Sequence, residues 1–235
     1  MGVFVGGGSG GRGAAVTGMP YSAQEVTEHV QTLAEGTRIT QPSQQVTYYR
    51  DSQGRTRTER TIPLPPGMAS QANAAPAFID IFDAVSGARY TLDPRSKTAR
   101  KVEIPPPPPP PPPGTTAVRA ANGRAVSAAI VPSGDPVAAQ RQRPETTHES
   151  LGIQSIEGVT AQGTRTTYVY PVGFFGNDRP ITVVDETWMC QDLKRVVLSK
   201  TSDPRSGEST TRLTNISRAE PDPALFQVPP DYEIK

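Results

Sequence analysis

Nine consecutive prolines, Pro105 to Pro113, interrupt the chain near its middle. Proline fixes φ and lacks a backbone N–H, so this run fits neither a helix interior nor a central strand. We expect polyproline II, a stiff spacer of roughly 28 Å at about 3.1 Å per residue. Residues 114–147 are rich in Ala, Pro, Gly, Ser and Thr without apolar periodicity, which predicts a disordered linker. We therefore assign 105–147 to a polyproline spacer and disordered insertion.

The rest of the chain divides into a tail and two stretches of ordinary composition. Residues 1–18 are rich in glycine and are predicted to form a flexible tail. The stretches 19–104 and 148–235 are each short for a domain with a large core of its own. We predict that together they form one β half-barrel domain, with two independent domains as the alternative.

The charge balance narrows the choice of partners. Lys and Arg total 24 against 23 Asp and Glu, a net charge of +1, without the basic excess that is typical of nucleic-acid binding. The most basic stretch holds Arg50, Arg55, Arg57 and Arg60, but Asp51 and Glu59 are interleaved with them, as on a solvated hairpin. No run approaches the roughly 20 apolar residues of a membrane-spanning helix. We therefore predict neither a nucleic-acid partner nor an integral membrane protein.

One helix is predicted near the N-terminus. Ser22 and Glu25 have the spacing of a capping box, in which each side chain bonds the backbone N–H of the other. Val26, Val30 and Leu33 follow at positions i, i+4 and i+7, which is one stripe of a helix. Gly36 can adopt the left-handed conformation that ends a helix. The pattern predicts an amphipathic helix over 22–35.

The remaining ordered sequence indicates β-strands. The segments rich in Val, Ile, Thr and Tyr are 45–50, 78–82, 89–92, 166–170, 181–189, 195–200 and 210–217. The turn signals between them are at 51–54, 85–87, 93–96, 176–178 and 203–207. Short strands separated by such turns predict hairpins rather than parallel βαβ units. The expected fold class is mainly β with one N-terminal α-helix: an antiparallel meander forming an open half-barrel, with the helix packed on its concave face.

Residues that could carry chemistry are few. His29 and His148 are the only histidines and Cys190 the only cysteine, so no intrachain disulfide can form. None of the spacings typical of zinc ligands occurs, and no G-x-S-x-G marks a nucleophile. We predict a protein without enzymatic activity, metal or cofactor. A hydrolase with an unrecognised triad is a weaker alternative.

The second half of the chain contains a group of aromatic residues. They fall around the chain breaks at Gly173 and Gly176, and are Tyr168, Tyr170, Phe174, Phe175 and Trp188. They either fill a core between helix and sheet or line a concave apolar face that binds a ligand. We name these five as the candidate ligand-binding residues.

Three segments carry a resemblance to known proteins. The closing stretch places Phe226, Pro229 and Tyr232 in a Phe-x-x-Pro-x-x-Tyr pattern that resembles the ending of periplasmic lipoprotein carriers and their half-barrel relatives. Segments 49–55 and 157–165 look like those of a group of uncharacterised bacterial envelope proteins with the same meander. The resemblance implies an unclosed β-barrel with a helix as plug, able to hold an acyl chain or a segment of another protein. The proline insertion and the lack of a lipobox cysteine depart from the carrier pattern.

These observations lead to one expected function and one main alternative. We expect a non-enzymatic envelope protein that binds an apolar small molecule or lipid, such as an acyl chain, or a protein partner's segment in its concavity. The alternative is a structural or interaction protein whose polyproline arm reaches a partner. The N-terminal Met-Gly-Val-Phe-Val-Gly-Gly-Gly has no basic n-region. A periplasmic or secreted location is therefore expected if an upstream leader exists.

Overall fold

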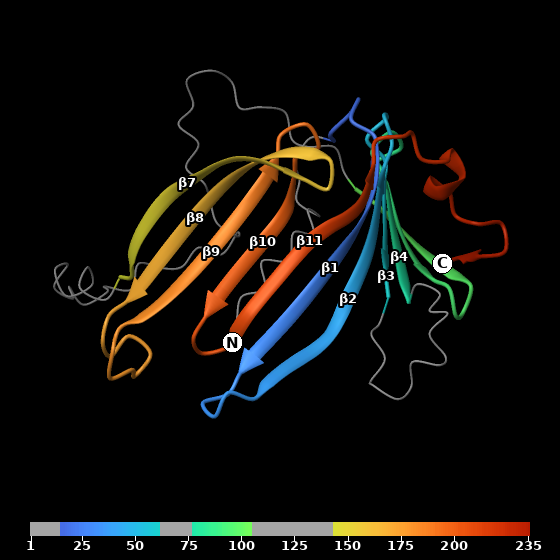
Figure 1. Cartoon of the computed structure of the whole chain (residues 1–235). Helices are drawn as coiled ribbons and strands as arrows, with labels where there is room; N and C mark the ends of the chain where they lie inside the picture. The colour runs from blue at the N-terminus through green and yellow to red at the C-terminus, as the bar shows by residue number, and fades with distance from the viewer. Residues whose placement is uncertain (1–14, 62–76, 105–142) are drawn as a thin grey trace, which may run out of the picture.

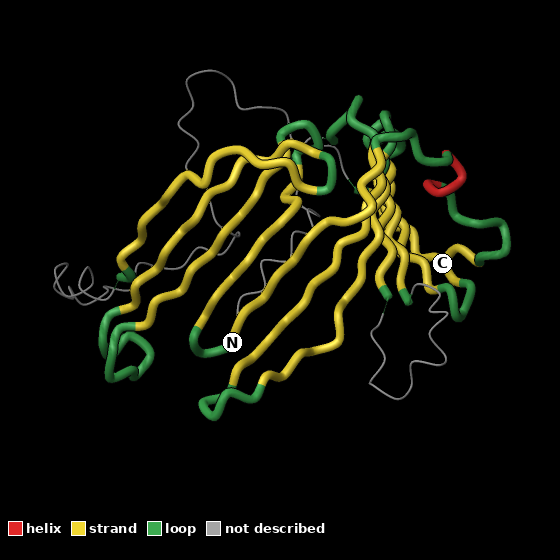
Figure 2. Tube along the Cα trace, viewed as in Figure 1, coloured by secondary structure: helices red, strands yellow, loops and turns green. Residues whose placement is uncertain are grey.

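The computed structural model describes residues 15–61, 77–104 and 143–235, and their twelve strands form one sheet (Figure 1). Strands and one short 3-10 helix make up the regular structure of these residues (Figure 2). The elements are β1 Tyr21–Thr32, β2 Arg38–Arg50, β3 Thr56–Arg60, β4 Phe78–Asp83, β5 Ala88–Asp93, β6 Thr98–Glu103, β7 Glu145–Ile156, β8 Val159–Tyr170, β9 Ile181–Cys190, β10 Arg195–Asp203, β11 Gly207–Ser217, the 3-10 helix η2 Pro223–Phe226, and β12 Glu233–Ile234.

Parts of the predicted tail and insertion lie outside the described residues. These are 1–14 of the tail and 105–142 of the insertion, including the polyproline run. Strand β7 begins at Glu145, within the range 105–147 that the sequence assigned to the insertion.

The sheet consists of two antiparallel meanders that meet where β1 pairs with β11. From β1 the strands follow chain order to β6, and from β11 they follow reverse chain order to β7. The short β12 adds to β6 in parallel through Glu233↔Thr98 and Ile234↔Ala99. The predicted antiparallel meander is confirmed, as a single open sheet. Figure 1 shows β7 to β11 face-on and β3 and β4 turned nearly edge-on, so the sheet bends strongly across its width.

The predicted turns lie between the strands as expected. In both Asp-Pro-Arg-Ser turns the aspartate Oδ1 accepts a hydrogen bond from the N–H two residues on, Arg95 N to Asp93 at 2.9 Å and Arg205 N to Asp203 at 2.9 Å. Asp83 accepts from Val85 N at 2.9 Å in the β4–β5 turn. The carboxylate thus satisfies backbone groups that the turn leaves unpaired. The repeated tetrapeptide marks two chemically equivalent turns.

The predicted helix over 22–35 is wrong, because this segment forms the central strand β1. Strand β1 is hydrogen-bonded along one edge to β2 and along the other to β11. Val26 and Val30 are four apart, a spacing that fits one face of a strand as well as one face of a helix. Gly36 has φ +88°, but it lies in the β1–β2 turn, where its N–H donates to Leu33 O at 2.9 Å.

Two-sided pairing with neighbouring strands therefore overrides the capping-box pattern. No α-helix occurs in the part of the chain that the structure describes, and no helix there is long and apolar enough to cross a membrane.

The buried apolar side chains form two cores on opposite faces of the sheet. The first core consists of Tyr21, Ala23, Tyr48, Val159, Ala161, Trp188, Cys190, Leu193, Val197 and Leu213. The second core consists of Ile79, Ile81, Leu92, Ala99 and Phe226. Tyr48 belongs to the first core, whereas the next residue, Tyr49, packs against the second. Since successive side chains of a strand point to opposite faces, β2 separates the two cores.

The C-terminal segment covers the second core. Phe226 of η2 is buried in it, and Leu225, Val228 and Tyr232 pack around it. Arg57 of β3 anchors the segment by donating to Leu225 O at 3.0 Å. Figure 1 shows this segment on the side of β3 and β4 that faces away from β7 to β11.

The first core gathers at one end of the long strands, which we call the core end. The β2–β3, β7–β8 and β9–β10 turns lie at this end, and the β1–β2, β8–β9 and β10–β11 turns lie at the other, the open end. Pairing of β10 with β11 begins only at Leu198↔Arg212, so the preceding Val197 is free to pack into the first core. The tip of the β7–β8 hairpin contributes Val159 and Ala161 to the same core.

Candidate functional site

The five predicted ligand-binding residues do not form one group. Tyr168 and Tyr170 pair with Val183 and Ile181 across the β8–β9 ladder, whereas Trp188 pairs with Gly163. No register shift interrupts this ladder, and positions 163 and 168 differ in parity, so Trp188 points to the opposite face from the two tyrosines. Trp188 is buried in the first core. The structure brings the other four residues together and leaves Trp188 apart from them.

Those four residues form a compact cluster at the open end, which we call the aromatic corner: Tyr168, Tyr170, Phe174 and Phe175. The ring centroid of Tyr170 lies 6.5 Å from Tyr168, 5.2 Å from Phe174 and 4.9 Å from Phe175. Phe174 and Phe175 meet edge-to-face at 4.7 Å. Offset and edge-to-face pairs of this kind stabilise one another beyond the area they bury.

An arginine from a neighbouring turn closes one side of the aromatic corner. The guanidinium carbon of Arg205 lies 4.2 Å from the Phe175 centroid and 5.6 Å from that of Tyr170. Asp203 holds the guanidinium, accepting from Arg205 Nε at 2.9 Å and Nη2 at 2.6 Å. These hydrogen bonds keep the pKa of Asp203 below its ordinary value and raise the pKa of Arg205. The sequence showed the turn but gave no signal that Arg205 reaches the aromatic rings.

The β8–β9 loop that carries Phe174 and Phe175 is braced by one amide side chain. Asn177 Nδ2 donates to Pro171 O at 2.9 Å and to Arg179 O at 2.6 Å, and Asn177 Oδ1 accepts from Phe175 N at 2.9 Å. Gly173 and Gly176 have φ of +82° and +81°, which L side chains rarely adopt. The loop conformation therefore depends on these glycines and on Asn177.

The aromatic corner exposes apolar surface. Phe174 is 37% exposed, Phe175 50% and the neighbouring Val172 59%, three large apolar side chains within four residues. Large apolar side chains that are exposed close together are typical of an interaction site. The corner offers aromatic faces and apolar edges, with the guanidinium of Arg205 held beside them.

A second polar and aromatic cluster lies in the first core and was not found from the sequence. Arg50 is 6% exposed and donates from Nε to Met19 O and from Nη2 to Leu193 O, both at 2.9 Å. Burial lowers the pKa of Arg50. Its guanidinium also lies 4.7 Å from the Tyr21 centroid. Arg50 therefore connects the start of β1 with the β9–β10 turn.

Arg195 occupies a similar position nearby. It lies 3.8 Å from the Tyr48 centroid and 3.5 Å from Glu25 Oε2, and the Tyr48 hydroxyl donates to Glu25 Oε1 at 3.2 Å. Burial alone would lower the pKa of Arg195, but Tyr21, Tyr48 and Glu25 outweigh it and raise that pKa. Burial is also the main cause that raises the pKa of Tyr48. These contacts brace the core end.

The other arginines of the basic stretch also have partners within the protein. Arg55 pairs with Asp51 at 2.5 Å, Arg57 with Glu59 at 2.7 Å, and Arg60 with Asp80 at 2.7 Å. Their arrangement is that of charged side chains on a hairpin, each engaged by a carboxylate.

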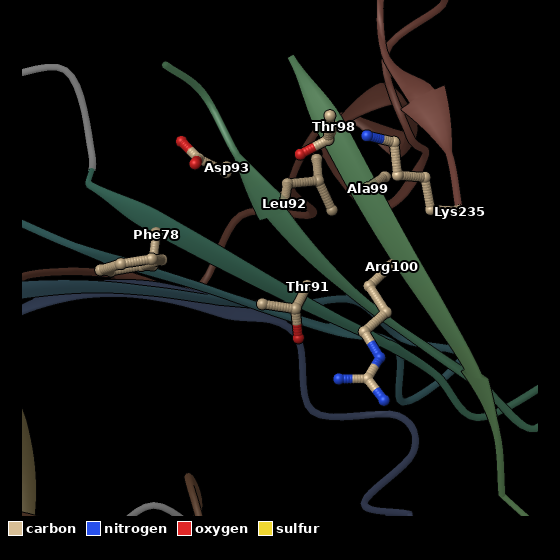
Figure 3. A pocket seen from close by; sticks show the side chains of 8 residues that line it. All are labelled: Phe78, Thr91, Leu92, Asp93, Thr98, Ala99, Arg100 and Lys235. Atoms are coloured by element: carbon tan, nitrogen blue, oxygen red, sulfur yellow. The ribbon is translucent and has the colours of Figure 1, made fainter. Parts of the chain in front are cut away.

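A hollow lies beside β4, β5 and β6, at the end of the sheet away from β7. Its volume is about 360 Å³, and Figure 3 shows its lining side chains: Phe78, Thr91, Leu92, Asp93, Thr98, Ala99, Arg100 and Lys235. Leu92 and Ala99 belong to the second core, so the hollow is an edge of that core rather than a separate site.

The histidines do not assemble catalytic or metal-binding groups. In the ranges that the structure describes, no three His, Cys, Asp or Glu side chains converge as metal ligands. His148 Nδ1 lies 3.1 Å from Thr166 Oγ1, and His29 pairs with Ser209 across β1 and β11. Across the sheet Ser209 pairs with Thr201 of β10, and Thr201 pairs with Asp185 of β9. Strand β9 is three strands from β1, about 14 Å at the usual strand spacing. Ser209, His29 and Asp185 therefore lie too far apart for a triad.

No family model and no curated protein matches this chain. Solved structures do match. An uncharacterised conserved protein from Thermus thermophilus has a TM-score of 0.42 and 9% identity, over 93% of this chain and 90% of that chain. MucB of Pseudomonas aeruginosa, in its complex with MucA, has a TM-score of 0.39 and 11% identity, over 92% of this chain and 58% of that chain.

A LolA superfamily protein from Nitrosomonas europaea has a TM-score of 0.30 and 10% identity, over 91% of this chain and 92% of that chain. The solved structures that match this chain thus include a MucB structure and a LolA superfamily protein, both at low sequence identity.

Proposed function

We propose that this protein is a non-enzymatic envelope protein that binds an apolar ligand, an acyl chain, at the aromatic corner. The observation that carries the proposal is the exposure of Phe174 and Phe175 on a loop that Asn177 and two glycines hold in place. A single exposed apolar side chain is common on protein surfaces. Several together form a patch whose burial by a ligand is favourable. The sequence resemblance to envelope carriers supports the envelope location, which cell fractionation of the native host tests.

The chemistry of the aromatic corner favours an acyl chain over a polar ligand. Tyr168 and Tyr170 pair with Val183 and Ile181, so the sheet beside the rings is apolar too. Each methylene that is removed from water contributes about 0.8 kcal/mol, close to a fourfold change in affinity. We therefore expect affinity to rise steeply with chain length until the corner is covered.

The proposal is tested by titrating the full chain with fatty acids of increasing length, below their critical micelle concentrations, by calorimetry. The variant Phe174→Ser with Phe175→Ser should weaken binding of the longest chain by about 100-fold, since it removes two large apolar contacts. The matched control is Ile153→Ser, which removes a side chain that is 75% exposed on β7, away from the corner. Equal weakening by the control, or affinity independent of chain length, would contradict the proposal.

The polyproline alternative stays a prediction, because its arm lies outside the described residues. It is separated from acyl-chain binding by deleting 105–142, which should leave the fatty-acid affinity unchanged.

A further inference from the structure

One face of the central strands carries a row of hydroxyl side chains. Thr164 of β8 pairs with Thr187 of β9, Thr187 with Ser199 of β10, Ser199 with Thr211 of β11, and Thr211 with Thr27 of β1. Each residue lies directly opposite the next, so all five share one face. We call Thr164, Thr187, Ser199, Thr211 and Thr27 the hydroxyl row.

A second polar row lies beside the first, one step toward the open end. It is made of Thr166, Asp185, Thr201, Ser209 and His29 in the same register. Tyr168 follows Thr166 on the same face of β8 and places an aromatic ring at the border of the rows.

The opposite face of the same strands has a different character. There Arg165 pairs with Glu149 at 3.0 Å and with Glu186 at 2.7 Å, and Arg212 pairs with Glu28 at 3.2 Å. Charged side chains that pair with one another and with water account for that face. The sheet is therefore polar on both faces here, but only one face is dominated by neutral hydroxyl groups.

The hydroxyl row keeps hydrogen-bonding capacity for a ligand. Thr27 Oγ1 and Thr211 Oγ1 share a hydrogen bond of 3.0 Å. Within the described ranges, the hydroxyls of Thr164, Thr187 and Ser199 make no hydrogen bond to another protein group, and all three side chains are at least partly exposed. Each hydroxyl can donate one hydrogen bond and accept two. Each hydroxyl of the row can thus both donate and accept a hydrogen bond, and the row carries no net charge.

This chemistry selects among ligand classes. An acyl chain would desolvate the hydroxyls without replacing their hydrogen bonds, which is unfavourable. A phosphate backbone would meet no lysine or arginine in either row. A chain of sugars matches both features, because its own hydroxyls donate and accept and it carries no charge.

The spacing of the row supports the same ligand. Neighbouring strands lie about 4.8 Å apart, so the five hydroxyls extend over roughly 19 Å. This repeat is close to the length of one pyranose unit in an extended 1,4-linked glycan, so one sugar can face each strand. We infer that the hydroxyl row binds an uncharged glycan chain laid across β8, β9, β10, β11 and β1, with Tyr168 packed against a sugar ring at its border.

The test uses the full chain with two defined probes, cellohexaose and chitohexaose, followed by calorimetry and by amide chemical shifts. Thr187→Val with Thr211→Val removes two hydroxyls at nearly constant shape and should weaken binding about tenfold or more. The matched control is Thr182→Val with Thr210→Val, on the same two strands but on the charged face, and it should leave the affinity within about twofold. Valine is favoured in strands, so both variants are expected to fold, which circular dichroism checks.

Three results would overturn the inference. The first is that neither hexasaccharide binds. The second is that the control variant loses as much affinity as Thr187→Val with Thr211→Val. The third is that binding is lost when the salt concentration rises from about 0.05 M to 1 M, which an uncharged ligand should not show. The glycan site does not depend on the proposed acyl-chain site. Phe174→Ser with Phe175→Ser should weaken fatty-acid binding by about 100-fold while leaving hexasaccharide binding intact.

Discussion

The two ends of the same long strands differ in what they bury. At the core end, Trp188, Leu213 and Tyr48 pack in the first core, and Arg50 and Arg195 brace it from within. At the open end, Phe174 and Phe175 stand partly in solvent, and the strands between carry polar side chains on both faces. Buried packing and exposed apolar surface are therefore separated along these strands. Parts with few buried apolar contacts are where binding surfaces and local opening concentrate.

The largest expected difference in stability between the two ends is at Trp188. Trp188→Ala should lower the free energy of unfolding by about 3–5 kcal/mol, because it empties a large volume in the first core. Phe175→Ala at the open end should cost under about 1 kcal/mol, because that ring is already half exposed. Urea denaturation followed by far-UV circular dichroism checks both, since Trp188 is the only tryptophan. Similar costs for the two variants would show that the ends are not different in stability.

A smaller loss is expected when the brace of the core end is removed. Arg50→Met keeps most of the side-chain volume but leaves Met19 O and Leu193 O without their donor, at a cost of about 2–3 kcal/mol. Arg60→Met serves as the control, because Arg60 pairs with Asp80 at the surface with its side chain 47% exposed, and should cost under about 1 kcal/mol. If thermal denaturation gave equal shifts for the two variants, Arg50 would not act as a brace.

The smallest effect concerns the response of the core end to alkaline pH. Burial raises the pKa of Tyr48 above its ordinary 10.0, so the folded state keeps the phenolic proton longer than the unfolded state. This contribution to stability is fully present below about pH 10 and is lost as the pH rises through the folded pKa. Tyr48→Phe loses the hydrogen bond to Glu25, about 1 kcal/mol at neutral pH, but does not undergo this alkaline loss.

The stability difference between the native protein and Tyr48→Phe should therefore shrink above pH 10. Urea unfolding at a series of alkaline pH values measures it. A difference that stays constant up to the pH of general alkaline unfolding would contradict the assigned role of Tyr48.

Strands and turns were predictable because their signals are local. An aspartate followed by proline bonds the backbone two residues on, whatever the rest of the chain does, and both such turns formed as expected. The segment 22–35 failed for the opposite reason. Its two valines are four residues apart, a spacing that fits a helix and a strand equally well. Pairing with β2 and β11 makes the segment a strand. Strand β11 is remote in sequence, and β2 is not recognisable from the sequence as a partner.

The candidate site was predictable only in part. Proximity in sequence brought Tyr168, Tyr170, Phe174 and Phe175 together correctly, because one turn carries them. It misplaced Trp188, because the face to which a strand residue points depends on register with the next strand, and one residue of difference reverses it. The hydroxyl row exists only when five strands pair in the correct register. Arg205 reaches the aromatic rings only because two turns lie close together in the folded protein. Neither feature therefore leaves a pattern in the sequence.

The ladder between β1 and β11 also bears on how the protein is made. Asn215 Nδ2 bonds Gln24 Oε1 at 2.8 Å across 191 positions of sequence, so the middle of the sheet joins the two distant parts of the chain. During synthesis β1 waits, with one edge unpaired, until nearly the whole chain has left the ribosome. Such a high contact order slows folding and prolongs the exposure of an open strand edge. The same pairing that places the hydroxyl row across the molecule thus keeps one edge of β1 open until late in synthesis.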